Sequence, residues 1–139
     1  MISRELAIAL RDAGLTWHPE SGDRFQLDLP DAVEAEVEAD VFTVSDMTIE
    51  AHHYPTGTIL GFNGTTEWAL DSVALEDALW LPHESQLREL LRGAFRALRR
   101  LSDPHEVEIV VGEESFVFQH PEPADAYALA VLELLRRIS

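Results

Sequence analysis

Tight turns between short stretches of alternating apolar residues constrain the fold of this chain most strongly. Residues 54–58 place Pro and Gly where a β-turn needs them, and residues 63–64 are Asn-Gly, the dipeptide most typical of a two-residue hairpin loop. Because such short connections can join only antiparallel strands, the sequence predicts an antiparallel meander over residues 41–70. Its expected strands are residues 41–51, 59–62 and 65–70.

Further strands are expected on both sides of this meander. Residues 25–29 alternate apolar and polar side chains, as a half-buried strand does. Residues 105–111 and 115–119 do the same on either side of a turn at Gly112, which predicts a second hairpin. The predicted strands are thus joined mostly by short turns.

Three other stretches repeat apolar residues every three or four positions, the spacing of an amphipathic helix. The first covers residues 3–13, with Ser3 suited to cap its N-terminus. After Leu75 the pattern turns helical again, and a long helix is expected over residues 84–101. The last helix is expected over residues 123–137.

These elements predict an α+β fold, with a mostly antiparallel β-sheet (the central meander plus the C-terminal hairpin) packed with three helices. At 139 residues the chain matches the usual size of one domain, so we expect a single domain spanning residues 1–139. Residues 30–40 carry five acidic side chains and no base. Because like charges repel, we expect a mobile acidic loop there.

The charge balance and two missing residue types exclude several kinds of chemistry. The formal net charge is −16, all ten basic residues are arginine, and both Lys and Cys are absent. Without Lys the chain has no phosphate-binding P-loop and no Schiff base. Without Cys it has no thiol nucleophile and no disulfide. We therefore expect no cofactor.

The same features bear on location and partners. No segment approaches the ~20 apolar residues of a membrane span, and the first residues lack the apolar run and cleavage site of a signal peptide. We therefore expect a cytoplasmic protein with no membrane span. Binding a nucleic-acid backbone requires clustered cations, for which a strongly negative chain is poorly suited. We expect instead a protein partner, which includes a second copy of this chain.

Half of the arginines gather in one short part of the sequence. On the expected helix, Arg88, Arg92 and Arg96 recur at every fourth residue and would form one row, which Arg99 and Arg100 extend. Such a row is often only a solvated helix face. On an acidic chain it is also a ridge suited to an acidic surface, so these five arginines are the candidate partner-binding residues.

Six histidines are present, but no HExxH motif and no HxxxH pair occurs, so the spacing does not indicate a metal site. His52 and His53 are neighbours on a predicted strand, and their side chains should point to opposite faces. Asp46 could still meet one of them across a hairpin. No GxSxG motif marks a nucleophilic serine, and Ser45 and Ser72, each beside an aspartate, are read as turn or strand-end residues.

Trp68 and Trp80 flank a stretch rich in apolar residues. Side chains of this size usually build the core, and we expect both there. A tryptophan that is exposed would instead anchor an interface, because Trp and Arg dominate binding hot spots.

Three motifs cover much of the chain outside the acidic loop: VFTVSDMTIE at 41–50, GFNGTTEWALDSV at 61–73 and ALWLPHESQLRELL at 78–91. Together they resemble a family of short actinobacterial proteins of unknown activity, some of which carry the label of a pilus assembly protein. The resemblance implies an accessory role in pilus assembly. It does not imply the P-loop ATPase of such systems, because this chain has no Lys and no glycine-rich phosphate loop.

A second resemblance concerns architecture. The helical motifs are ELAIALRDAG at 5–14, LPHESQLRELL at 81–91 and PADAYALAVLELL at 123–135. With the strand pair between the last two, they look like small phage- and plasmid-associated α/β/α sandwich proteins. Those proteins lack an assigned reaction, so the resemblance implies no catalytic residue.

These observations favour a non-enzymatic cytoplasmic protein that binds another protein through its arginines. Two alternatives stay open. One is a small hydrolase or metal-binding protein that uses Asp46 with His52 or His53. The other is an acidic decoy, whose carboxylates imitate spaced phosphates and occupy the surface of a nucleic-acid-binding protein.

Overall fold

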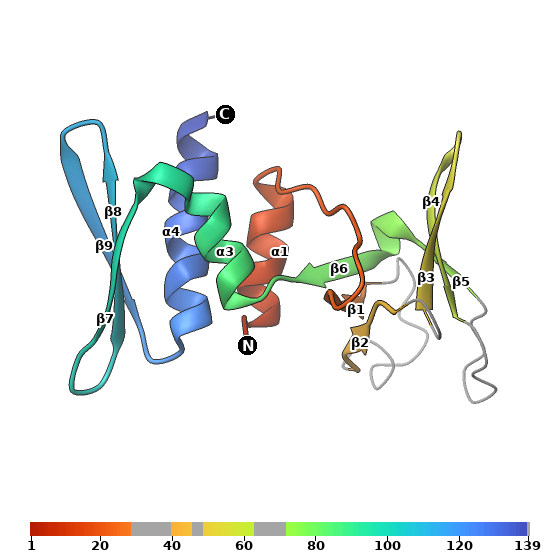
Figure 1. The fold of residues 1–139 in the computed structure, drawn as a ribbon, viewed down its shortest axis with the longest axis horizontal. Coiled ribbons are helices and arrows are strands. Elements are labelled where there is room, and N and C mark those ends of the chain that lie inside the picture. The colour runs from red at the N-terminus through yellow and green to blue at the C-terminus, as the bar shows by residue number, and fades with distance from the viewer. Residues whose placement is uncertain (29–39, 46–48, 63–71, 139) are drawn as a thin grey trace. The chain divides into compact units, whose positions relative to one another are not determined.

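The structure, a computed structural model, describes residues 1–28, 40–45, 49–62 and 72–138. These residues form the predicted α+β fold, with three α-helices and three antiparallel three-stranded sheets (Figure 1). They fall into two compact units, which are described separately. Unit 1 comprises Met1–Thr16 and Leu81–Ser139, and unit 2 comprises Trp17–Trp80.

Unit 1 is built around its last helix. Its elements are α1 (Arg4–Asp12), α3 (Glu84–Leu91), the 3-10 turn η2 (Arg92–Ala94), β7 (Phe95–Arg100), β8 (His105–Val111), β9 (Glu114–His120) and α4 (Pro123–Ile138). Helix α4 packs on β8 and β9 with one side and on α1 and α3 with the other (Figure 1). A helix covered on two sides must be apolar almost all round, and α4 buries every residue from Ala124 to Ala128.

Helix α1 begins and ends as the sequence predicts. The Ser3 hydroxyl accepts a hydrogen bond from the Leu6 N–H at 3.3 Å, which satisfies one of the unpaired donors of the first turn. At the other end Gly14 has a φ of 110°, a conformation that glycine adopts without strain. The helix predicted over residues 123–137 is also confirmed, since α4 ends only one residue later.

The long helix predicted over residues 84–101 is wrong. Helix α3 ends at Leu91, the chain reverses through η2, and β7 pairs antiparallel with β8, with Leu98 opposite Val107. The apolar spacing of this segment fits a helix, but pairing with β8 outweighs that local preference. Gly93, in the middle of the expected helix, was the signal against it.

The C-terminal hairpin confirms its prediction. Strands β8 and β9 pair from His105 and His120 to Val111 and Glu114, around a turn in which Gly112 has a φ of 65°. Along β8, Val107 and Ile109 are buried and alternate with more exposed residues, which identifies the face that packs on the helices.

The described residues of unit 2 form strands and one short turn of 3-10 helix. They are β1 (Arg24–Leu27), β2 (Phe42–Thr43), β3 (Ile49–Tyr54), β4 (Gly57–Phe62), β5 (Ser72–Ala74), η1 (Leu75–Asp77) and β6 (Ala78–Leu81), whose last residue belongs to unit 1. The first sheet has the order β2-β1-β6 and the second the order β3-β4-β5. The predicted turn at residues 54–58 is confirmed, with Tyr54 paired to Gly57.

Two predictions for unit 2 are wrong. Residues 41–51 are not one strand, because β2 pairs with β1 whereas β3 pairs with β4 in the other sheet. The segment after Leu75 does not turn helical beyond η1, because Ala78, Leu79 and Leu81 are buried on β6. Burial on both faces removes the alternation by which a strand is recognised in sequence.

The core of unit 2 is aromatic. Trp17, Phe25 and Val44 are buried, and Phe42 and Trp80 pack against them. The Trp17 indole stacks on Trp80 with ring centres 6.4 Å apart, and its Nε1–H donates a 2.9 Å hydrogen bond to Asp23. The prediction that Trp80 belongs to the core is therefore confirmed.

Several predictions fall outside the described residues. They concern Leu29, most of the acidic loop at 30–40, Asp46, the Asn63-Gly64 turn, the strand at 65–70, Trp68 and Asp71. Within the described part of the chain, no helix has both the length and the apolar composition needed to cross a membrane.

The prediction of a single domain can be tested by unfolding. Unit 1 has 75 residues and unit 2 has 64, and units this small are marginal by themselves, so we expect one calorimetric transition for the whole chain. Phe25→Ala in unit 2 and Ile109→Ala in unit 1 each remove a fully buried side chain, at a cost of about 2–5 kcal/mol. Both variants should lower the same transition. Two separate transitions, each moved by only one variant, would contradict the prediction.

Candidate functional site

The five candidate arginines lie on α3, on β7 and in the reversal of the chain between them. Arg88 is on α3, Arg92 ends that helix, and Arg96, Arg99 and Arg100 are on β7. The row along one helix is therefore wrong, because α3 stops before it could carry more than the first of them. The reversal nevertheless keeps Arg88, Arg92 and Arg96 close to the turn of the chain, whereas Arg99 and Arg100 lie at the far end of β7.

A groove of about 650 Å³ is lined by α3, β7 and one residue of α4. Phe95, Leu98 and Tyr127 give it an apolar surface, and Leu98 is 42% exposed. Its charged side chains come from α3 and its C-terminal end: Glu84, Arg88, Glu89 and Arg92. Two positive and two negative charges therefore line the groove.

The Arg88 charge is held at this groove by aromatic rings. Its guanidinium carbon lies 4.5 Å from the centre of the Phe95 ring, and Phe95 lies 5.9 Å from the ring of Tyr127. A cation over a partly exposed ring gains about 0.5–1 kcal/mol. The contact favours this position of the guanidinium, whose N–H groups form no hydrogen bond among the described residues.

Tyr127 contributes a neutral phenol to the groove. Burial raises its pKa above the usual value, the Arg88 charge opposes this rise, and the Glu84 charge adds to it. Because the net shift is upward, the hydroxyl keeps its proton at physiological pH. Tyr127 can then donate or accept a hydrogen bond without adding charge.

A second hollow of about 430 Å³ adjoins the groove at Phe95, which lines both. Arg96 and Arg99 line it from β7, and Val110 lines it from β8. Arg96 lies at an irregularity in the pairing of β7 with β8, where the register shifts between Phe95 and Ala97. Such bulges redirect a side chain from the regular pleat.

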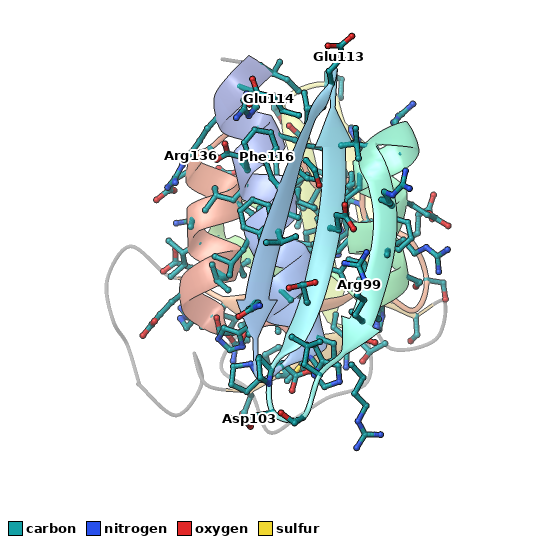
Figure 2. All side chains as sticks on the ribbon, turned by 90° about the vertical axis from the view of Figure 1, so that its left-hand side faces the viewer. Arg99, Asp103, Glu113, Glu114, Phe116 and Arg136 are labelled. Carbon is teal, nitrogen blue, oxygen red and sulfur yellow. The ribbon has the colours of Figure 1, made fainter. Side chains whose placement is uncertain are left out.

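Arg99 is fully engaged on the outer face of the sheet (Figure 2). One of its terminal nitrogens donates to Glu106 at 2.9 Å, and the other donates to Glu108. The hydrogen bonds of Gln119 to Glu106 and of Ser115 to Glu108 hold the pKa of each carboxyl below its usual range, and those of Arg99 add to this. The Arg99 charge is thus already balanced by this sheet.

Three arginines remain as the candidate site. No ion pair of Arg88, Arg92, Arg96 or Arg100 occurs among the residues that the structure describes, and Arg100 lines neither hollow. We call Arg88, Arg92 and Arg96 the arginine surface. Sequence reasoning identified its members but missed Phe95, Leu98 and Tyr127, because the groove exists only once β7 folds back beside α3.

Arg92 adopts a backbone conformation that glycine would adopt more easily. Its φ is 51° and its ψ is −130°, and it is the one non-glycine residue with positive φ in the described part of the chain. For a residue with a Cβ such a conformation costs on the order of 1–3 kcal/mol. Strain of this kind concentrates at functional sites, which makes the side chain of Arg92 a candidate for function rather than for stability.

The alternative site of Asp46 with His52 or His53 consists mainly of residues that the structure does not describe. Asp46 and the side chain of His52 are not described, and the exposed His53 shares a 3.1 Å hydrogen bond with the Thr58 hydroxyl. No group of three or more His, Asp or Glu side chains that could hold a metal ion is found among the described residues.

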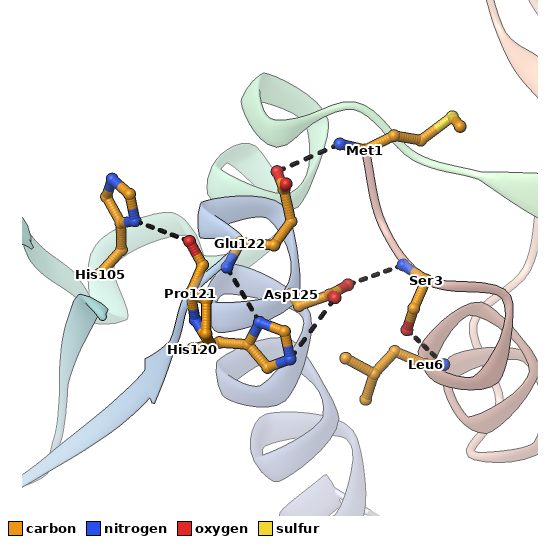
Figure 3. Close-up of polar contacts among 8 residues, drawn as sticks. All are labelled: Met1, Ser3, Leu6, His105, His120, Pro121, Glu122 and Asp125. Carbon is orange, nitrogen blue, oxygen red and sulfur yellow. Dashed lines mark hydrogen bonds and ion pairs between the residues drawn. The ribbon is translucent and has the colours of Figure 1, made fainter. Parts of the chain in front are cut away.

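A histidine–aspartate pair that the sequence did not reveal lies where β9 meets α4 (Figure 3). His120 Nε2 lies 3.6 Å from Asp125, and His120 Nδ1 accepts a 3.0 Å hydrogen bond from the Glu122 N–H. Asp125 is buried, and its other oxygen accepts from the Ser3 N–H at 2.7 Å. The N-terminal amine of Met1 pairs with Glu122 at 3.1 Å.

This cluster joins α1 to α4. His120 Nδ1 accepts from the backbone, and its Nε2 lies beside the carboxylate of Asp125. The Ser3 hydroxyl is also occupied, since it caps α1. The sequence offered one signal for this contact, because Asp125 places a carboxylate in the first turn of α4.

No family model, no curated protein and no solved structure matches this chain.

Replacing Arg92 with glycine tests the strain at the end of α3. Arg92→Gly should stabilise the chain by about 1 kcal/mol, because the gain from relieving φ exceeds the extra flexibility that glycine gives the unfolded state. Urea unfolding measures the difference. Arg92→Ala is the matched control, since it removes the same side chain but keeps the Cβ, and it should bring no gain. Equal stabilities for the two variants would contradict this account.

The Arg99 contacts predict a dependence of stability on pH. The lowered pKa values of Glu106 and Glu108 mean that their contribution is present at neutral pH and is lost as pH falls through those values. Arg99→Ala should therefore lower the melting temperature at neutral pH, with the difference shrinking in acid. Arg100→Ala on the same strand should show no such dependence. A wild type and an Arg99→Ala variant that differ equally at all pH values would contradict the prediction.

Proposed function

We propose that this chain is a non-enzymatic protein-interaction module that binds an acidic partner through its arginine surface. The observation that carries the proposal is the gathering of Arg88, Arg92 and Arg96 around one chain reversal, without an ion pair among the described residues. The rest of the chain is acidic enough to make the formal net charge −16. Unpaired cations on such a background select an acidic surface by attraction and reject others by repulsion.

Two further features support binding at this surface. Leu98 exposes an apolar side chain beside the arginines, and interfaces combine apolar contact with Arg more often than the remaining surface does. The strained backbone at Arg92 is consistent with a side chain kept for its contacts with a partner.

The location and partners proposed here follow from the sequence. We propose a cytoplasmic protein, with a protein partner and no nucleic acid. An accessory role in pilus assembly, implied by the resemblance to short actinobacterial proteins, is compatible with a binding module and stays a prediction. The His/Asp-dependent hydrolase or metal-binding reading and the acidic-decoy reading also stay predictions, because no described residue favours either.

Affinity capture with charge-reversed variants tests the proposal. Arg88→Glu, Arg92→Glu and Arg96→Glu, combined in one chain, should abolish recovery of partners from an extract of the cells that make the protein. Recovery by the wild type should fall as salt rises, because exposed charges are screened. Mass spectrometry of the captured proteins measures both effects.

The matched control has the same change in charge elsewhere in unit 1. It combines Arg4→Glu, Arg11→Glu and Arg136→Glu, and it should capture the same partners as the wild type. Circular dichroism of both triple variants checks that each is folded. Loss of recovery in both variants, or in neither, would contradict a role for the arginine surface.

A further inference from the structure

We propose that strand β9 is an interface at which two copies of this chain pair, so that their sheets join into one. The two copies of β9 would run antiparallel about a two-fold axis at Val117. This surface lies on the opposite edge of the sheet from β7, so the inference goes beyond the proposed function and does not depend on it. Three features of β9 support it: a free edge, apolar side chains that stay partly exposed, and a symmetric sequence.

The outer edge of β9 is free to pair. In the sheet order β7-β8-β9 it comes last, and among the described strands it pairs only with β8 (Figure 2). Val111 and Glu114 flank a two-residue turn and so form a hydrogen-bonded pair, and such pairs occur at every second residue of an antiparallel ladder. The backbone N–H and C=O groups of Ser115, Val117 and Gln119 therefore point away from β8. A second copy centred at Val117 would pair with these groups in register.

The two edges of this sheet differ in what protects them. Strand β7 carries Arg96, Arg99 and Arg100, and its pairing with β8 is irregular at Arg96. Charges and bulges of this kind keep an edge strand from pairing with another chain. Strand β9 has the sequence ESFVFQH, without Lys, Arg or Pro, and it pairs with β8 in a regular register along its whole length. Its edge therefore lacks the features that prevent association.

Apolar side chains of β9 stay partly exposed on both faces of the sheet. Val107 and Ile109 of β8 are fully buried on the face that packs on the helices. Their cross-strand neighbours Phe118 and Phe116 lie on the same face but are only half-buried. On the opposite face Val117 is 53% exposed. A strand added at this edge would cover part of this apolar surface, which favours association.

The sequence of β9 is complementary to itself when it is read in the opposite direction. Counted outward from its centre, the strand has matching residue types on both sides: Val117 at the centre, then Phe116 and Phe118, Ser115 and Gln119, and Glu114 and His120. In an antiparallel pair about this centre, aromatic rings would face aromatic rings and polar side chains would face polar ones. Glu114 would face His120, so no two like charges would meet. Such cross-strand pairs stabilise a sheet, and their symmetry favours a second copy over an unrelated strand.

Sedimentation velocity of the full chain over a range of concentrations tests the pairing. The wild type should show a reversible equilibrium between monomer and dimer. Val117→Lys should raise the dissociation constant of the dimer by roughly tenfold or more, because two ammonium groups would face each other across the axis. Within its own chain this position lies opposite Glu108, so the variant should stay folded, which circular dichroism checks. Val41→Lys, at an exposed valine of unit 2, is the matched control and should dimerise as the wild type does.

Cysteine substitutions test the register, because the chain has no Cys of its own. Val117→Cys would place two thiols opposite each other across the axis, with Cα atoms about 5.5 Å apart, a separation that a disulfide spans. Ser115→Cys is the control on the same face of the same strand, because its counterpart would lie opposite Gln119 instead. Under a mild oxidant, Val117→Cys should form a cross-linked dimer roughly tenfold faster or more, as non-reducing gels measure.

Each outcome decides for or against the inference. A wild type that is monomeric at every concentration would overturn it, and so would a dimer that Val117→Lys leaves unchanged. Equal cross-linking of the two cysteine variants would show that the strands do not pair about Val117, which also overturns it. If the wild type is monomeric and Val117→Lys instead loses a partner captured from an extract, the occupant of β9 is another protein and the inference is wrong.

The variant in which Arg88, Arg92 and Arg96 are changed to glutamate separates this inference from the proposed function. It should dimerise as the wild type does, because its substitutions lie away from β9. A dimer that this variant dissociates would form at the arginine surface, and the inference would be wrong. Loss of captured partners in this variant, together with a wild type that never dimerises, would support the proposed function and overturn only the pairing through β9.

Discussion

The architecture of unit 1 depends on covering α4 from two opposite sides. The sheet covers one side, and α1 and α3 cover the other. Ala126, Ala128 and Ala130 are completely buried, and such small side chains let the flanking layers approach the helix closely. Because both layers meet the same helix, the edge strand β7 and the helix α3 come to flank Tyr127. The groove and its arginines are therefore a product of packing around α4.

Elements encoded by local turns and caps could be predicted from the sequence. Ser3 and α1, the turn before Gly57, the hairpin around Gly112 and the helix after Pro123 each carry a signal within a few residues. The elements that were predicted wrongly are those whose conformation depends on contacts with residues distant in the sequence. Strand β7 reads as the continuation of a helix, and β6 reads as helical because it is buried on both faces.

The candidate site illustrates the same limit. Sequence spacing selected Arg88, Arg92 and Arg96, but for a row along a helix that does not exist. The residues stay together because a short reversal returns the chain beside its own helix. Arg99 could not be separated from them in advance, since its partners Glu106 and Glu108 belong to the next strand. The positions of the arginines could thus be read from the sequence. Which of them form ion pairs could be known only from the pairing of the strands.

The stacking of Trp17 on Trp80 has a consequence for how this chain is assembled. These are the first and last residues of unit 2, and their rings lie 6.4 Å apart. Everything between them is thus an insertion into the sequence of unit 1 whose two ends lie close together. Since closing a loop twice as long costs only about 0.6 kcal/mol more, the loop-closure entropy depends little on the length of this insertion. Length variation in this gene is therefore expected to accumulate within the insertion and to spare the helices around it.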